Sequence, residues 1–541
     1  MDPVIFGALA IAYLILIVVL GIHGRRRTRG AEDFLVGGRR MHPIVLALSY
    51  GATFISISAI IGFGGVAGEL GMGLVWLVVL NIGLGVLISF VVFGKRVREV
   101  GSRLGAVTFP DLMGKCYDSP MMQTASGFII LVGMPLYSAA ILIGGAHFIS
   151  TALGLPFDLS LLGFALVVAV YVILGGLVTV MHTEAVQGAI MFVGMIVLLV
   201  LTYSMLGGVG PANADLTSMV DMVPKDLWEA GHRGWTAMPE LGSPIWLTLI
   251  TTLTLGVGIG ALAQPQLVVR FMTVRDNRSL NRAVAVGGIF ILLLTGGAYT
   301  LGALTNVYFM QEQGEIATKA VGGNIDSIIP MFINSSMPDA FVVVFMLALL
   351  AAAMSTLSSL FHTMGTSAGY DMWRNLKDSK ISVLWKGRAG RVLDRLPLPG
   401  QDSFTGIQVG ILLMIIVSVA VAFLLPGSII ARATAMFFGL CGSALLPVYA
   451  HALYSKRPSA KAAQASLAVG KVTWLSWTTF VHLHESSSLG ISHFLFGQEA
   501  VLGSHMQVVD PLIVALPCST AALLVVWYLE KRGILFKGPG V

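Results

Sequence analysis

Long apolar stretches separated by short polar segments recur along the whole chain. A helix needs about 20 consecutive apolar residues to cross a bilayer core about 30 Å thick. The pattern therefore predicts an all-α integral membrane protein with thirteen transmembrane helices. Their approximate limits are 3–23, 44–70, 72–94, 122–153, 158–180, 184–207, 244–265, 283–310, 338–369, 404–425, 428–453, 462–484 and 509–529.

The basic residues fall mainly in alternate segments between these helices. If the N-terminus is outside, 28 of the 33 Lys and Arg residues lie in cytoplasmic segments, and only Lys225, Arg233 and Lys319 lie in outer segments. Basic residues concentrate on the cytoplasmic side of membrane proteins. We therefore expect the N-terminus outside and the C-terminus inside. The remaining two, Arg432 and Lys471, lie within predicted helices.

Composition excludes several classes of protein. The chain is 56% hydrophobic and 11% charged, whereas a soluble domain has about 25% charged residues. No loop exceeds about 40 residues, so there is no room for a separate soluble catalytic domain. The formal charge of +6 does not indicate nucleic-acid binding, because the basic residues concentrate in the cytoplasmic segments. We therefore expect the protein to lie in a lipid bilayer and to bind no nucleic acid.

The polar outer segment 208–243 divides the helices into two groups. We expect an extra helix and a basic cytoplasmic loop over 1–43, followed by a first five-helix repeat over 44–207. A second five-helix repeat follows over 244–453, and two C-terminal helices with a tail occupy 454–541.

Each group opens with a glycine-rich helix. The first reads LSYGATFISISAIIGFGGVAGELG and the second reads WLTLITTLTLGVGIGALAQPQ. Irregular backbone within a bilayer is tolerated only where protein or a water-filled cavity surrounds it. Two interrupted helices at matching places indicate a transporter built from inverted repeats. For any one of these glycines, close packing of helices is an alternative explanation.

Hydroxyl residues share one face of the ninth predicted helix. Ala352, Ser355 and Thr356 stand at positions i, i+3 and i+4 of a helix. Hydroxyl and carbonyl oxygens are hard ligands that suit an alkali cation. Such hydroxyls also bond back to carbonyls of their own helix, so the pattern alone leaves both interpretations open.

Five stretches together resemble the sodium:solute symporter family, which includes proline, pantothenate, monocarboxylate, sialic acid and sugar carriers. The resemblance covers nearly the whole chain and implies a LeuT-type core of five plus five helices within thirteen spans. The stretches are AEDFLVGGRR (31–40), ISAIIGFGG (57–65), GGLVTVMHTEAVQG (175–188), AQPQLVVRFMTVRD (263–276) and AAAMSTLSS (351–359).

The resemblance also implies a site. In this family a sodium ion lies between the broken second helix and the ninth helix. The implied Na⁺ ligands are the carbonyls of Ala52, Ile55 and Ala352 and the hydroxyls of Ser355 and Thr356. The implied substrate-side residues are Phe54, Ser56, Tyr137, Gly260 and Gln264.

Two departures from the family pattern bear on the solute. Phe54 stands where proline carriers have an aspartate, which argues against proline, and Glu184 replaces the usual aspartate of a TD-x-x-Q motif. The stretch ATFISISAIIGFGGVAG is closer to pantothenate-like and monocarboxylate-like members.

The resemblance therefore predicts a sodium-coupled symporter of the cell membrane, not an enzyme, that imports a small organic solute by alternating access. A carboxylate is the expected solute and Na⁺ the co-transported ion. The alternatives are proton-coupled symport, or sodium symport of a neutral solute such as an amino acid or a sugar. A small accessory membrane subunit cannot be recognised from one sequence.

Arg432 is an ionisable residue inside the eleventh predicted helix, four residues from its outer end. Charged residues at such positions are expensive and are functional candidates. Arg432 is either an attractor for an anion or an interfacial anchor.

Overall fold

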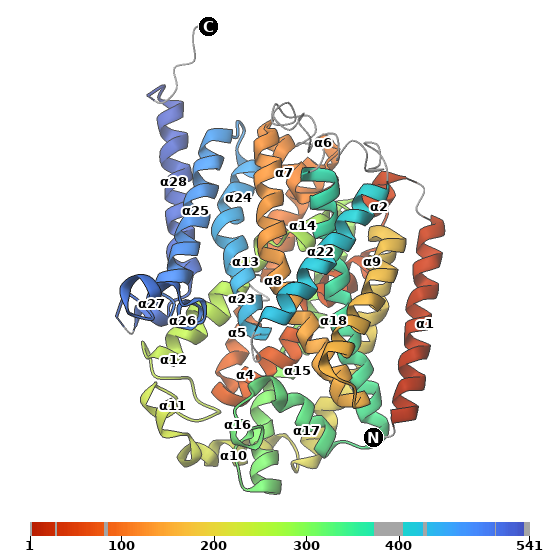
Figure 1. The fold of residues 1–541 in the computed structure, drawn as a ribbon, viewed down its shortest axis with the longest axis vertical. Helices are drawn as coiled ribbons and strands as arrows, with labels where there is room; N and C mark the ends of the chain where they lie inside the picture. The colour runs from red at the N-terminus through yellow and green to blue at the C-terminus, as the bar shows by residue number, and fades with distance from the viewer. Residues whose placement is uncertain are drawn as a thin grey trace.

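The chain forms a bundle of helices whose long members run roughly parallel (Figure 1). The computed structural model describes residues 3–27, 30–80, 85–372, 404–425, 430–503 and 505–534. Within these ranges every regular element is a helix and no strand occurs. The predicted all-α membrane architecture is therefore confirmed.

The first part of the chain contains the helices up to the segment that divides the two groups. The η labels mark short 3₁₀ or π segments. These elements are α1 (Pro3–Arg27), α2 (Ala31–Val36), α3 (Pro43–Phe54), η2 (Ser58–Gly62), α4 (Phe63–Leu70), α5 (Val75–Leu80), η5 (Ser89–Gly94), α6 (Lys95–Leu104), α7 (Phe109–Tyr117), α8 (Pro120–Leu153) and α9 (Phe157–Met205).

The rest of the chain supplies the second group and the C-terminal helices. These elements are α10 (Val209–Ser218), α11 (Lys225–Glu229), α12 (Pro244–Leu247), η7 (Thr248–Gly256), α13 (Val257–Gly260), η8 (Ala261–Ala263), α14 (Pro265–Phe271), α15 (Asn277–Gln313), α16 (Ala317–Ala320), η9 (Ile325–Ser327), α17 (Ile328–Ser336), α18 (Asp339–Thr366), η10 (Ser367–Met372), α22 (Phe404–Leu424), α23 (Ile430–Leu440), η11 (Cys441–Leu445), α24 (Leu446–Tyr454), α25 (Ala460–Phe480), α26 (Leu483–Leu489), α27 (Ile491–Phe496) and α28 (Pro511–Lys531).

Ten helical segments of the described residues are long and apolar enough to cross a membrane. Two shorter apolar helices, Pro43–Phe54 and Phe157–Ile173, accompany them. The sequence predicts thirteen crossings. The helix predicted over 462–484 forms as α25 but is not among the ten. Parts of the predicted helices 72–94 and 428–453, and most of the basic loop 370–403, lie outside the described residues.

Two predicted helices join without a connecting loop. α9 covers both 158–180 and 184–207, and its one non-helical residue is Gly176, with φ 61° and ψ −166°. The predicted boundary near residue 182 is therefore several residues too late. Gly176 is the natural place for the change of direction because its φ is left-handed and a Cβ there would lie 2.4 Å from the ring of Phe34.

Both glycine-rich helices are discontinuous. α3 ends at Phe54, and Ile55 has φ −88° and ψ 90°, so the chain leaves the helix before η2 and α4 continue outward. The second helix runs through α12, η7, α13 and η8, then is interrupted at Gln264, which has φ −67° and ψ 114°. Pro265 starts α14 at the position where a missing N–H costs nothing.

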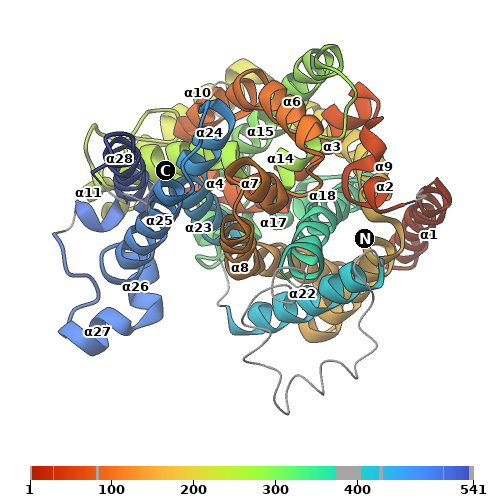
Figure 2. The same cartoon turned by 90° about the horizontal axis from the view of Figure 1, so that it is seen from above.

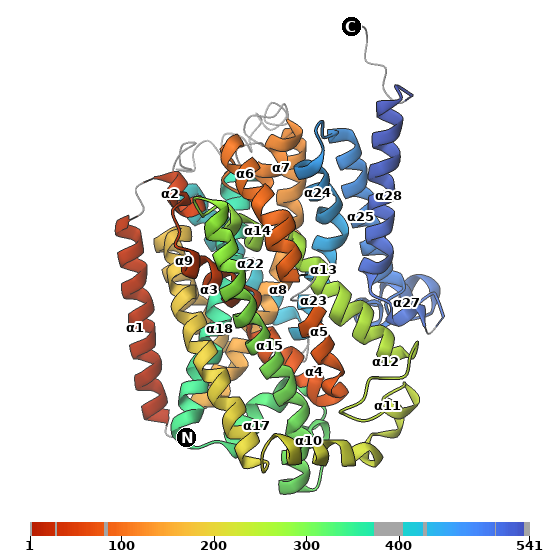
Figure 3. The same ribbon diagram turned by 180° about the vertical axis from the view of Figure 1, so that it is seen from behind.

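α18 lies inside the bundle, and its residues 348–366 are all buried. α1 packs on α9 at one edge, and α25 pairs with α28 at the other (Figure 2). α1 begins at the end of the molecule that holds α10 and α17, and α28 finishes at the opposite end (Figure 3). The segment 208–243 folds into short helices at the first of these ends.

Close packing of α15 on α4 depends on one glycine. A Cβ at Gly302 would lie 2.0 Å from the carbonyl oxygen of Gly64, whereas a Cβ at Gly288 of the same helix would meet nothing within 4 Å. Overpacking of this kind costs about 1–3 kcal/mol. We predict that Gly302→Ala lowers the melting temperature of the detergent-purified protein and that Gly288→Ala does not. Equal melting temperatures for Gly302→Ala and the unmodified protein would contradict this packing.

Candidate functional site

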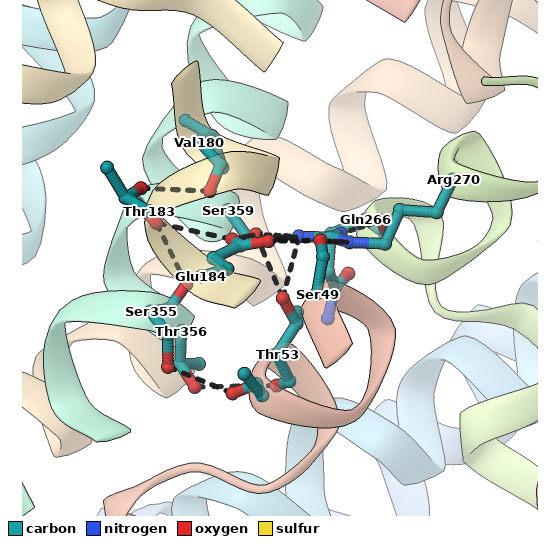
Figure 4. A network of polar contacts seen from close by, with 12 residues as sticks. Ser49, Thr53, Val180, Thr183, Glu184, Gln266, Arg270, Ser355, Thr356 and Ser359 are labelled. Carbon is teal, nitrogen blue, oxygen red and sulfur yellow. Dashed lines mark hydrogen bonds and ion pairs between the residues drawn. The ribbon is translucent and has the colours of Figure 1, made fainter. Parts of the chain in front are cut away.

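The interrupted end of α3 meets the middle of α18. The Ser355 hydroxyl lies 2.9 Å from the carbonyl oxygens of both Ala52 and Ala352, and it has one proton to donate to them. The Thr356 hydroxyl lies 3.4 Å from the carbonyl oxygen of Thr53 (Figure 4). The last turn of a helix has carbonyls without partners in that helix. These contacts place oxygen atoms of α3 and α18 together in a fully buried region.

The residues implied as Na⁺ ligands are therefore neighbours. The Ala52 carbonyl, the Ala352 carbonyl and the Ser355 hydroxyl converge directly. The Thr356 hydroxyl faces the same helix end through the carbonyl of Thr53. Ile55 is the residue at which the backbone leaves α3.

The implied substrate-side residues lie around an aromatic group. The ring of Tyr137 stacks on Phe437 at 5.8 Å and meets Phe438 edge-on at 5.8 Å, and the Tyr137 hydroxyl interacts with Ser56. The ring of Phe54 lies 6.4 Å from that of Phe438. Neither of these two phenylalanines of α23 is among the residues predicted from the sequence. The FF pair in ATAMFFGL was the available signal.

Gln264 and Gly260 occupy different surroundings at the second interruption. Gln264 is fully buried, and its Oε1 accepts a hydrogen bond of 2.7 Å from Gln266. The Gln264 Nε2 atom is buried and has no hydrogen-bond partner among the described residues. Gly260 lies against α23, where a Cβ would come 2.4 Å from the carbonyl oxygen of Phe438. Within the described part of the chain, Gln264 thus has an amide N–H that is available to a ligand, whereas Gly260 allows close packing against α23.

A buried ion pair stands beside the end of α3. Arg270 Nη2 lies 2.8 and 2.7 Å from the two carboxylate oxygens of Glu184, and the side chains are 1% and 0% exposed. The same nitrogen donates to the Thr53 hydroxyl at 2.6 Å and to the Ser359 hydroxyl. Ser49 donates to Glu184 at 2.5 Å. Figure 4 shows these groups converging from α3, α9, α14 and α18.

The predicted helices 244–265 and 283–310 place Arg270 among the basic residues of the cytoplasmic segment between them. The structure corrects this, because Arg270 belongs to α14 and is buried in the protein. Its position five residues after Pro265 was the signal that it continues the interrupted helix. Glu184 was noted only as a departure from the family pattern, and its partner was missed.

Two discontinuous helices around a buried polar centre define the architecture of a membrane transporter. Residues 34–386 match the model of the Sodium:solute symporter family, which is more than half of the chain. The chain belongs to the sodium:solute symporter family. It is therefore a sodium-coupled solute symporter and a multi-pass membrane protein, and the family is one of transporters, not enzymes. The predicted family is confirmed.

Individual relatives and structures support the same assignment. The chain is 26% identical to the osmoregulated proline transporter OpuE of Bacillus subtilis over 471 residues, 86% of this chain and 87% of that protein. It is 29% identical to the sodium/pantothenate symporter of Escherichia coli over 297 residues, 54% of this chain and 59% of that protein. A solved Na⁺-coupled sialic acid symporter in a substrate-bound outward-open state superposes with a TM-score of 0.72 at 17% identity, covering 98% of both chains. The fold is LeuT-like.

We predict strong coupling between Glu184 and Arg270. Removing one partner of a buried pair leaves an uncompensated charge and typically costs about 3–5 kcal/mol, whereas removing both avoids that cost. Glu184→Gln and Arg270→Gln are each expected to lower the melting temperature of the purified protein, and the double variant is expected to melt above Arg270→Gln or Glu184→Gln alone. Additive losses in this double-mutant cycle would contradict the pairing.

Proposed function

We propose that this symporter couples Na⁺ to the import of a small carboxylate by alternating access, with Na⁺ bound where α3 ends against α18. The single observation that carries the proposal is the Ser355 hydroxyl, which bridges a carbonyl at the end of α3 and one within α18. A cation bound between these oxygens, with the Ser355 hydroxyl proton turned away from the Ala52 carbonyl, would hold the two helices together.

The chemistry of the oxygen atoms supports a monovalent cation. Carbonyls at a helix C-terminus carry the negative end of the helix dipole, and unwound backbone carbonyls of discontinuous helices bind Na⁺ in transporters. The proposed ligands are all neutral oxygens, namely the carbonyls of Ala52, Ile55 and Ala352 and the hydroxyls of Ser355 and Thr356. The nearby carboxylate of Glu184 already neutralises Arg270. The Na⁺ charge is therefore free to attract an anionic solute.

Two groups at the interruptions suit a solute carboxylate. The buried Nε2 atom of Gln264 has a hydrogen-bond donor without a partner, and an unmet buried donor favours a ligand that can accept from it. The chain beyond the first interruption restarts at Ser58, so the N-terminal end of this outer half-helix lies near Ser56. Half-helix N-termini favour anionic substrate groups. The relative named as a sodium/pantothenate symporter supports the same class of solute.

We infer thirteen spans, with the N-terminus outside and the C-terminus inside. The two five-helix repeats would cover 44–207 and 244–453, with the segment 208–243 outside. Each proposed repeat begins with one of the discontinuous helices. Rocking of one bundle against the other would then expose the bound pair to either side. Na⁺ and solute each raise the affinity of the other, as thermodynamic linkage requires.

The driving force limits the stoichiometry. A tenfold Na⁺ gradient supplies about 1.4 kcal/mol, and 100 mV adds about 2.3 kcal/mol for each charge moved. One Na⁺ with a neutral solute supports accumulation of several-hundred-fold by this arithmetic. One Na⁺ with a monoanion moves no net charge, which leaves about tenfold. A steeper carboxylate gradient therefore requires a second cation.

We predict that Ser355→Ala combined with Thr356→Ala abolishes Na⁺-stimulated uptake, because two of the five proposed ligands disappear. Thr520→Ala on α28 is the control, since within the described residues its hydroxyl bonds only to Leu516 of its own helix. Uptake into proteoliposomes with Na⁺ and pH gradients imposed separately measures the effect and also tests proton coupling. Unchanged Na⁺ stimulation in the double variant would contradict the site, and uptake driven by the pH gradient alone would contradict Na⁺ coupling.

We predict that Gln264→Glu raises the KM of carboxylate solutes at least tenfold, because a donor becomes a negative charge. Gln264→Asn retains the amide and is the matched control. A panel of short monocarboxylates, pantothenate, proline and glucose in the same uptake assay reports the solute class. Sodium-driven uptake of glucose with no carboxylate uptake would contradict the assignment of a carboxylate.

A further inference from the structure

A cavity lies between the outer halves of the two discontinuous helices. Its volume is about 240 Å³, and α4, η7, α23 and α25 form its walls together with the segments around η9 and before α28. Of these elements, α4 lies in the half of the bundle nearer α10 and α11 (Figure 1). By the proposed topology this half faces the outside of the cell.

Arg432 is the one Lys or Arg residue among those that line the cavity. Its side chain is solvent-exposed, and no hydrogen bond or ion pair joins the guanidinium to any residue in the described ranges. Two histidines, His482 and His484, also line the cavity. A guanidinium stays protonated in proteins, so Arg432 is the fixed cation of the cavity.

Carboxylates are near Arg432 but do not pair with it. Glu69 of α4 and Asp326 of η9 both line the cavity and interact electrostatically with Arg432, but within the described residues neither forms an ion pair with it. The Asp326 carboxylate interacts instead with the backbone amide of Ile430. Glu485 contacts His482, and Asp510 caps α28 through the amide of Leu512. The planar donor face of the Arg432 guanidinium is thus left available.

The remaining wall is apolar and leads toward the proposed transport site. Trp474, Met436 and Leu253 line the cavity beside Arg432, and an apolar wall strengthens a charge interaction by lowering the local dielectric constant. Phe438, which contacts both Phe54 and Tyr137, stands six residues after Arg432, or about 9 Å along α23. The volume suits a small solute more than a drug-sized ligand.

We propose that this cavity is the external loading site of the symporter and that Arg432 receives the carboxylate of the solute before it passes inward. The inference rests on the proposed function and adds a residue that determines solute class. A guanidinium offers two parallel donors that match a carboxylate, which a lysine ammonium does not. Solutes without a carboxylate, such as glucose, gain nothing from this contact.

Arg432→Gln tests the proposal in proteoliposome uptake. Hydrogen bonds to charged groups contribute about 1.5–3 kcal/mol, so we expect the KM of carboxylate solutes to rise at least tenfold. The maximal rate and the half-saturating Na⁺ concentration are expected to stay within twofold, and Arg432→Lys should restore part of the affinity. Lys319→Gln removes an exposed charge of the same sign from α16, which does not line the cavity, and is the control.

Glu69→Gln distinguishes solutes that carry only a negative charge from zwitterionic solutes such as proline. Removing this anion should lower the KM of acetate, pyruvate and pantothenate, because the repulsion beside Arg432 is weakened. For the zwitterion proline, loss of Glu69 should raise the KM, because its ammonium group loses a partner. If Arg432→Gln leaves the KM of anionic and zwitterionic solutes unchanged while uptake stays Na⁺-dependent, the loading site is wrong. That result would leave the proposed function standing.

Cysteine labelling gives a readout that does not need transport. Met436→Cys places a thiol in the cavity wall, in a background where Cys116 and Cys518 are replaced by serine. Pyruvate, pantothenate and proline are tested as protectants against an anionic thiosulfonate reagent. The proposal expects at least one of them to slow labelling when Arg432 is present, and expects that protection to disappear in Arg432→Gln. Protection that survives the substitution, or no protection by any of the three, would overturn the proposal.

Discussion

A membrane helix that stops halfway must find partners for its backbone, and this constraint organises the centre of the protein. Hydrocarbon offers no hydrogen bonds to the carbonyls freed at the end of α3. α18 supplies two of them with hydroxyl partners, through Ser355 and Thr356. A cation can replace either of these hydrogen bonds, because a neutral hydrogen bond contributes only about 1 kcal/mol net. The same interruption that creates an unmet backbone group therefore creates a place for an ion.

The Glu184–Arg270 pair supports this arrangement from the other side. It connects α9 of the first proposed repeat with α14 of the second, and Arg270 also holds the Thr53 hydroxyl. A buried pair of this kind is poor at adding net stability but effective at fixing which groups face each other. It holds the end of α3 beside α18 and leaves the neutral oxygen atoms next to the pair free. In this account the fixed charges position the site, and the transported charge binds next to them.

Much of the fold was predictable because membrane helices are long and their composition is distinctive. The apolar stretches and the glycine-rich interruptions at 44–70 and 244–265 identified the helices and the two discontinuous ones. The joining of two helices at Gly176 was missed, since a kink leaves no polar segment. The buried role of Arg270 was also missed, because a basic residue near the end of an apolar stretch looks the same in sequence whether it faces water or a carboxylate. The pairing with Glu184 depends on contacts 86 residues apart.

The central claim is that Na⁺ takes the place of the hydrogen bond between Ser355 and Ala52. A high-resolution map of the full-length protein in lipid nanodiscs, recorded at saturating Na⁺ and again with choline in its place, tests this most directly. The account predicts density for an ion among the oxygens of Ala52, Ile55, Ala352, Ser355 and Thr356 in the first map only. A map at saturating Na⁺ in which the Ser355 hydroxyl still donates to the Ala52 carbonyl, with no ion between α3 and α18, would contradict it.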